Sequence, residues 1–193
     1  MIDISTIKFN LQSEFHMLRH FESADEKMLE LLLKEGYKIA EIKKELSLPG
    51  SKFHSDFAND IGELIVRFEQ YSYSETIGVN GNLILQSSII KSEFPNGIGT
   101  HAVIPIQDIP DKERKNVYPK KNREMELLHY NVKLLPSTNE CTLILKPIKN
   151  GYLFISSFPG PAAMPIPSTS MDLELYSKCR KFWDNHVFLE KIS

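Results

Sequence analysis

The fold is decided by residues 126–158, "ELLHYNVKLLPSTNECTLILKPIKNGYLFISSF", where three apolar runs alternate with two short polar segments. The runs are rich in branched and aromatic residues, which favour strands. The polar segments are "PSTNE" at 136–140 and "KNG" at 149–151, and the Asn-Gly pair in the second is typical of a tight hairpin turn. Three strands joined by two short turns predict an antiparallel meander.

The rest of the chain is expected to pack helices against this short sheet. Three N-terminal segments and the C-terminal tail carry apolar residues at helical spacing. These segments are 23–36, 38–50, 55–72 and 170–191. The sequence therefore predicts an α+β fold, with a helical N-terminal region at 1–75 and an antiparallel-sheet domain, closed by a C-terminal helix, at 76–193.

The composition is that of an ordinary folded protein. Of the 193 residues, 41% are hydrophobic and 25% are charged, and the net charge of −2 does not point to nonspecific binding of nucleic acid. The N-terminus lacks the pattern of a signal peptide, and no apolar run approaches the length of a membrane span. Cys141 and Cys179 have no metal-binding spacing, so we expect reduced thiols in a cytoplasmic protein without a membrane partner.

The motifs of the common metal and nucleotide sites are absent from the sequence. There is no HExxH, Walker, GxGxxG or GxSxG pattern. His16 and His20 are four residues apart, but two ligands without a third are weak evidence for a metal. We therefore predict no metal and no cofactor.

Strand alternation within 126–134 separates an apolar from a polar set of side chains. The apolar set is Leu128, Tyr130, Val132 and Leu134, and the polar set is His129, Asn131 and Lys133. The polar set is either an ordinary solvated sheet face or one wall of a binding site.

A second histidine follows two glycines in "GIGTHAVIPI" at 97–106. Glycine has no side chain, so Gly97 and Gly99 permit a phosphate or a sugar to approach the backbone closely. Thr100 and His101 follow directly and would then contact that group. The alternative is a surface histidine in a loop whose glycines serve only the turn.

Further candidates flank these two histidines. The segment 110–123, "PDKERKNVYPKKNR", is predicted to be a long charged loop that is either plain solvated surface or, through Lys120, Lys121 and Arg123, an anion clamp. A guanidinium holds a phosphate through two parallel hydrogen bonds, which favours Arg123. Ser156 and Ser157 end the last apolar run, where their hydroxyls either satisfy turn amides or face a cleft.

Two histidines, a cation and a hydroxyl suit the cleavage of RNA through its own 2′-hydroxyl. One imidazole removes the 2′ proton, a second acid protonates the leaving 5′ oxygen, and a cation stabilises the charge on phosphate; the product is a 2′,3′-cyclic phosphate. Histidine suits both transfers because its pKa lies near neutrality. The predicted catalytic residues are His101, His129, Arg123 and Ser157, and the predicted substrate-binding residues are Lys121, Lys133, Asn131, Thr100 and Ser156.

Residues 83–160 resemble the barnase/RelE-like group of bacterial RNase toxins in "GTHAVIP", "NRE", "LHYNVK" and "GYLFISSFPG". The resemblance implies a metal-independent endoribonuclease with an RNA substrate and a cognate antitoxin or immunity protein. The roles it implies are acid–base catalysis by His101 or His129, phosphate binding by Arg123 and Lys133, and support by Ser156 or Ser157.

Two other functions stay open. Residues 28–57 are similar to helix-turn-helix sequences of DNA-binding regulators, with a reading helix that begins near Ser51 and presents Lys52 and His54 to a groove. Acidic residues in the same helix oppose phosphate. Alternatively, the chain is a non-enzymatic protein-interaction module, an adaptor or a neutralising partner, that docks through its polar sheet face.

Overall fold

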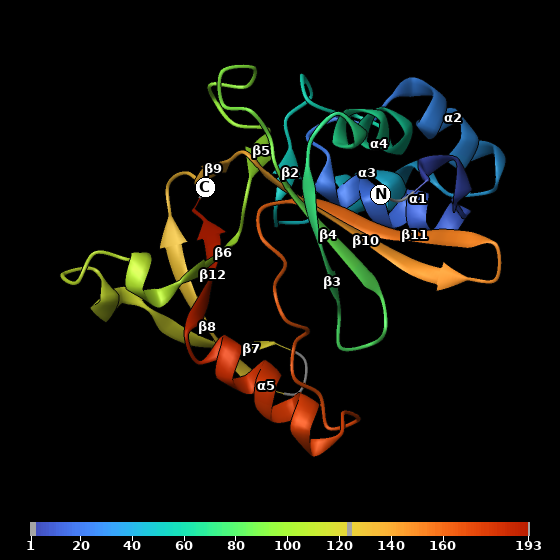
Figure 1. Cartoon of the computed structure of the whole chain (residues 1–193). Helices are drawn as coiled ribbons and strands as arrows, with labels where there is room; N and C mark the ends of the chain where they lie inside the picture. The colour runs from blue at the N-terminus through green and yellow to red at the C-terminus, as the bar shows by residue number, and fades with distance from the viewer. Residues whose placement is uncertain (1–2, 123–124, 193) are drawn as a thin grey trace. The chain divides into compact units, whose positions relative to one another are not determined.

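A computed structural model of the chain describes residues 3–122 and 125–192 and divides into two compact units. Unit 1 comprises 1–101 and 137–162, and unit 2 comprises 102–136 and 163–193. Each unit therefore combines segments that are distant in the sequence, and each is described by itself below (Figure 1).

Five α-helices and twelve strands are assigned among the described residues. The helices are α1 (Leu11–Met17), α2 (Glu26–Lys34), α3 (Ile39–Leu46), α4 (Ile61–Glu69) and α5 (Leu173–Trp183). The strands of unit 1 are β1 (Ile7–Lys8), β2 (Lys52–Phe53), β3 (Tyr73–Ile77), β4 (Leu83–Ser88), β5 (Gly99–Thr100), β9 (Ser137–Thr138), β10 (Glu140–Ile148) and β11 (Gly151–Pro159). The strands of unit 2 are β6 (Val103–Pro105), β7 (Tyr118–Asn122), β8 (Met125–Val132) and β12 (His186–Lys191).

Unit 1 is built on a five-stranded sheet in the order β1-β11-β10-β4-β3. The pairs are antiparallel except for β1, which runs parallel to β11. The predicted hairpin at 149–151 is confirmed, because β10 and β11 are antiparallel partners joined there. A small sheet in the order β2-β5-β9 completes the unit.

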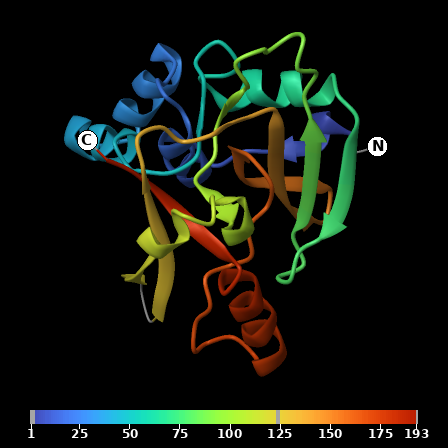
Figure 2. The same cartoon turned by 90° about the vertical axis from the view of Figure 1, so that its left-hand side faces the viewer.

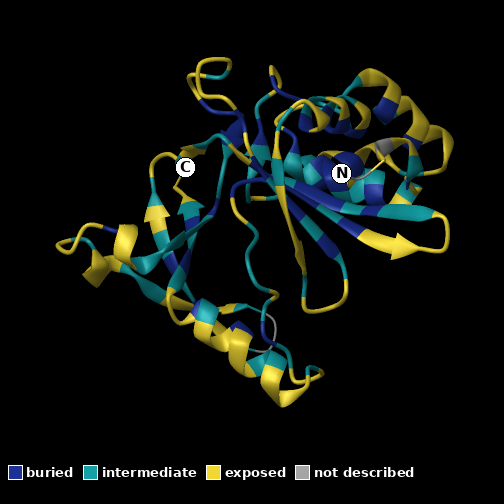
Figure 3. Cartoon of the chain, in the orientation of Figure 1, coloured by how far each residue is buried: buried dark blue, intermediate teal, exposed yellow. Residues whose placement is uncertain are grey.

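The helices α1 to α4 belong to unit 1 and share one core with its sheet. Their apolar stripes bury residues such as Leu32, Leu64 and Phe68 in the same cluster as Leu143 and Phe154 of the sheet. The Asp25 and Asp60 side chains cap α2 and α4 by accepting from backbone N–H groups of the first turn. Burial along β10 and β11 is visible in Figure 3.

Unit 2 is a mixed four-stranded sheet in the order β6-β12-β8-β7. Its central pair, β12 and β8, is parallel, and the outer pairs are antiparallel. The turn after α5 leads directly into β12 (Figure 2). One face of the sheet buries Ile109, Val187 and Leu189, and the other carries Phe188, on which Trp183 of α5 stacks.

The α+β class is confirmed, but the single meander is wrong. The run that contains β8 lies in the sheet of unit 2, whereas β10 and β11 lie in the sheet of unit 1. The segment 136–140 is not a hairpin turn, since Ser137–Thr138 forms β9 and pairs with β5. The two runs separate because β10 pairs with β4, while β8 packs Leu128, Tyr130 and Val132 on the core of unit 2.

Three local predictions also need correction. The C-terminal helix ends at Trp183, and residues 186–191 form β12 instead. The charged segment 110–123 is not a plain loop, because it contains β7. The reading helix of the helix-turn-helix is not formed: Lys52 lies in β2, and its ammonium donates to the carbonyls of Arg19, Phe21 and Leu46.

Replacing Gly151 by alanine is expected to lower the free energy of unfolding by about 1 kcal/mol more than Gly81→Ala does. Both glycines have positive φ, +119° and +76°. A Cβ on Gly151 would lie 2.4 Å from the Thr6 carbonyl oxygen, whereas a Cβ on Gly81 would have no heavy atom within 4 Å. Urea unfolding of the two variants measures this difference, and equal losses would contradict it.

Among the described residues, none of the helices has the length and apolar character needed to cross a bilayer.

Candidate functional site

A cluster of polar side chains lies on one face of the unit 2 sheet and is centred on Glu190. This Glu190 cluster consists of Tyr118, Lys120, His129, Asn131 and Glu190. The Lys120 ammonium lies 2.5 Å and His129 Nδ1 2.8 Å from Glu190 Oε1. The Tyr118 hydroxyl donates to Oε2 at 3.0 Å and lies 2.9 Å from Asn131 Oδ1. One carboxylate thus contacts an amine, an imidazole and a phenol.

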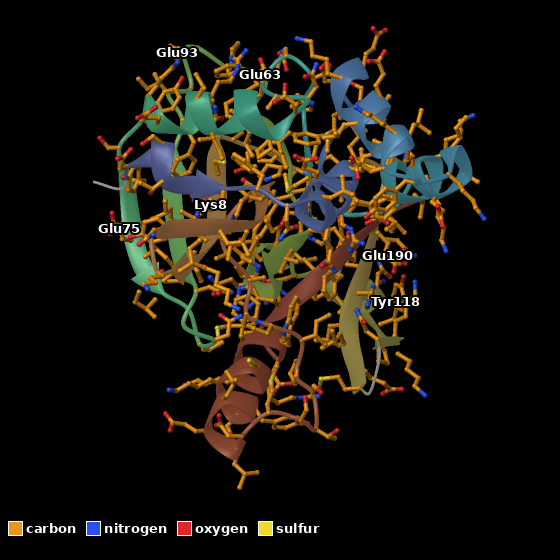
Figure 4. The ribbon with its side chains drawn as sticks, turned by 90° about the vertical axis from the view of Figure 1, so that its right-hand side faces the viewer. Lys8, Glu63, Glu75, Glu93, Tyr118 and Glu190 are labelled. Carbon is orange, nitrogen blue, oxygen red and sulfur yellow. The ribbon has the colours of Figure 1, made fainter. Side chains whose placement is uncertain are left out.

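Strand register brings these side chains together. Tyr118 is opposite His129 across the β7–β8 pair, and Glu190 is opposite Asn131 across the β8–β12 pair. Alternation keeps Tyr118 and Lys120 on one face of β7, which is the face that His129 and Asn131 occupy on β8. The Tyr118 ring reaches over β8 to Glu190, and Figure 4 shows these two labelled side chains next to each other.

His129 is the buried member of the cluster. Its side chain is only 8% exposed, and its ring lies between those of Tyr118 and Phe188, at centroid distances of 6.1 and 5.3 Å. Burial lowers the pKa of His129, and the Glu190 carboxylate opposes this shift. Among the described residues neither of its ring nitrogens has a hydrogen bond of acceptable geometry, so the 2.8 Å approach of Nδ1 to Glu190 is an electrostatic contact. His129 is therefore held as a neutral imidazole at neutral pH, behind Glu190.

The other members are open to solvent. The Glu190 and Lys120 side chains are 32% and 53% exposed. The hydrogen bond from Lys120 lowers the pKa of Glu190, so its carboxylate is ionised at neutral pH. Desolvation and the bond to Glu190 raise the pKa of Tyr118, so its phenol is protonated. A carboxylate and a protonated phenol in contact form an acid–base pair on this face of the sheet.

The predicted residues of unit 2 divide between the cluster and its surroundings. His129 and Asn131 belong to the cluster. Lys121 is exposed on β7, on the opposite face from Tyr118. It lies opposite Glu126 of β8 in the strand register. Lys133 follows the end of β8 and lines a groove of about 480 Å³ together with Tyr130. Arg123 lies outside the described residues.

The predicted residues of unit 1 lie in two places. Thr100 ends β5, and His101 follows it beside Gly160, where a Cβ would lie 2.7 Å from the Cβ of His101. Ser157 is fully buried, and its hydroxyl donates to the Thr142 carbonyl at 2.6 Å. Ser156 is also buried, beside the sulfur of Met17. Both serines therefore have their partners in the core, and these partners are a strand carbonyl and a sulfur rather than turn amides.

Sequence reasoning missed Glu190 and Tyr118. The sequence predicts Glu190 within the C-terminal helix, although "HVFLEK" at 186–191 is a short run that contains a branched and an aromatic residue, Val187 and Phe188. Such residues in a short run favour a strand. Tyr118 carried no such signal, because its role depends on a partner 72 residues away in the sequence.

Among the residues that the structure describes, no three histidine, cysteine or acidic side chains are arranged to hold a metal ion. No protein-family model, no curated protein and no solved structure matches the chain, so the Glu190 cluster is interpreted from its own chemistry.

Proposed function

We propose that the protein is a metal-independent endoribonuclease that cleaves RNA by attack of the 2′-hydroxyl, with the Glu190 cluster as its acid–base centre. The observation that supports this proposal is the simultaneous contact of one ionised, solvent-accessible carboxylate with a lysine, a protonated phenol and an imidazole. The carboxylate supplies the base, the lysine the cation and the phenol the acid that the reaction needs.

In the proposed reaction Glu190 takes the proton from the 2′-hydroxyl, and the 2′ oxygen attacks phosphorus. The bond from phosphorus to the 5′ oxygen breaks, and the Tyr118 hydroxyl gives its proton to that leaving oxygen. Lys120 stabilises the charge that develops on the phosphate oxygens. The products are a 2′,3′-cyclic phosphate and a 5′-hydroxyl end. Return of the proton from Glu190 to Tyr118 restores the starting state.

His129 acts in this proposal as a positioning residue. It is too buried to contact a substrate, but its Nδ1 lies 2.8 Å from the carboxylate oxygen that also contacts Lys120. An imidazole at this place orients the carboxylate, as the orienting third group does in other acid–base sites. Both acid and base come from unit 2 in this reaction, so it gives no role to His101 of unit 1, and the acid–base role of His101 stays a separate prediction.

The test is incubation of the purified full chain with a mixed-sequence RNA in the presence of EDTA. We expect fragments with 2′,3′-cyclic phosphate and 5′-hydroxyl ends, and no cleavage of a strand with 2′-deoxy sugars. His129→Asn places an amide nitrogen where Nδ1 is, so it should keep more activity than His129→Leu. His101→Gln should keep its activity if the Glu190 cluster supplies both acid and base, whereas a loss of activity in a folded variant would instead support the acid–base role predicted for His101.

Two results would contradict the proposal. Intact RNA at stoichiometric protein, with and without added Mg²⁺, would leave the protein-interaction module as the better interpretation. Equal cleavage of the 2′-deoxy strand would exclude attack by the 2′-hydroxyl.

A further inference from the structure

A cavity of about 310 Å³ lies in unit 1 where α2 and α4 begin beside α1. This volume is at the lower end of the range for small-ligand sites. Its apolar walls are Phe9, Met28, Leu31 and Ile61, and its charged residues are Glu14, Asp25, Asp60 and Lys27. Phe9 is 42% and Leu31 is 39% exposed, so the cavity is open to solvent on an apolar side.

Glu14 is the member of this cavity that lacks a partner. Its Oε2 atom is buried and has no hydrogen-bond partner among the described residues. Buried polar atoms are almost always paired in folded proteins, so an unpaired carboxylate oxygen beside a cavity is available to accept from a donor bound there. Burial also raises the pKa of Glu14, and a bound cation would reverse this shift.

The charges around the cavity favour a cation as that donor. The charged residues that line it are three acids and one base, Lys27. Asp25 and Asp60 also accept backbone N–H groups as helix caps, which leaves Glu14 as the carboxylate with an unused buried oxygen. A bare metal ion does not fit, because the described residues offer no metal-binding group and the walls are apolar.

We propose that this cavity binds an organic cation, an ammonium or guanidinium group on an aliphatic chain. The chain would lie against Met28, Leu31 and Ile61, and the cationic head would donate to Glu14. This site is independent of the proposed ribonuclease activity, because every residue in it belongs to unit 1 and none to the Glu190 cluster.

The test is titration of the full chain with n-hexylammonium, followed by NMR of the methyl groups of Met28, Leu31 and Ile61. We expect saturable shifts at these methyl groups. Glu14→Gln should weaken binding about ten-fold, since it removes a charge-assisted contact, and Lys27→Gln should tighten it. Glu30→Gln is the matched control, because Glu30 is exposed on α2 and does not line the cavity.

A second probe, N-acetyl-lysine N′-methylamide, distinguishes the two sources of such a cation. Binding at least as tight as that of n-hexylammonium would assign the site to a basic side chain of a partner polypeptide, and weaker binding would assign it to a free amine. Three results would overturn the proposal: no saturable shift with either probe, equal binding of neutral 1-hexanol, or the same change in affinity for Glu14→Gln and Glu30→Gln.

Discussion

Replacing Glu190 by glutamine is expected to lower the rate of RNA cleavage at least about a hundred-fold, which corresponds to about 2.7 kcal/mol in the activation free energy. Glutamine keeps the shape of the side chain, but its single acceptor oxygen can serve only one of the donors Tyr118 and Lys120, and it cannot accept the 2′ proton. Single-turnover cleavage of a labelled RNA measures the rate. Glu174→Gln, which neutralises an exposed carboxylate paired with Lys178 on α5, should leave the rate unchanged.

Lys120→Gln adds a pH readout to this prediction. The hydrogen bond from Lys120 lowers the pKa of Glu190, so the wild-type rate should fall only below about pH 4.3, the usual carboxyl value. Without the ammonium, the acidic limb of the pH–rate profile should move to higher pH. Trp183 stacks on Phe188, two residues before Glu190, so its fluorescence reports whether unit 2 stays folded. A Glu190→Gln variant with wild-type rate and intact fluorescence would overturn the assignment of the base.

The wild-type protein is expected to lose about 2 kcal/mol of unfolding free energy between pH 7 and pH 5 through His20. Desolvation lowers the pKa of His20 to about 3, while its Nδ1–H donates to the Ser51 carbonyl at 3.1 Å. In the unfolded chain the pKa is about 6.5, so the unfolded state takes up a proton below that pH and the folded state does not. The stability is therefore fully present above pH 6.5 and falls as the pH approaches 3.

His20→Asn isolates this contribution. Its amide nitrogen takes the place of Nδ1 as donor to Ser51, but it does not titrate. The variant should lose about 2 kcal/mol less than the wild type between pH 7 and pH 5. Urea unfolding must be followed by circular dichroism, because Trp183 reports unit 2 and His20 lies in unit 1. An equal pH dependence in the two proteins would show that His20 is not its cause.

Local signals predicted local structure well. Helical spacing predicted α2 and α4, although α4 begins only at Ile61, and Asn-Gly predicted the β10–β11 turn, because each signal depends on residues a few positions apart. The predicted partner of β8 was wrong, because we expected β8 to pair with β10. Two apolar runs joined by a short polar segment do not specify whether they pair with each other or with strands from elsewhere in the chain.

In the candidate site, too, the local arrangement was predicted from the sequence and the contacts between distant strands were not. Alternation in β8 correctly put His129 and Asn131 on one face, opposite Leu128 and Tyr130. It did not reveal that His129 is buried, since that follows from Phe188 and Tyr118, which neighbouring strands place beside it. Burial of a strand face depends on what covers it, and strand periodicity describes only the strand itself.

By itself, the sequence determined the α+β class, most helices, the final hairpin and the polar row on the His129 strand, because propensity, capping and periodicity act over short stretches of chain. The tertiary structure alone decided that β12 lies parallel to β8 and thereby sets Glu190 against Lys120, His129 and Tyr118. Pairing between distant segments is selected by the burial of both sheet faces, and that is a property of the whole packed unit.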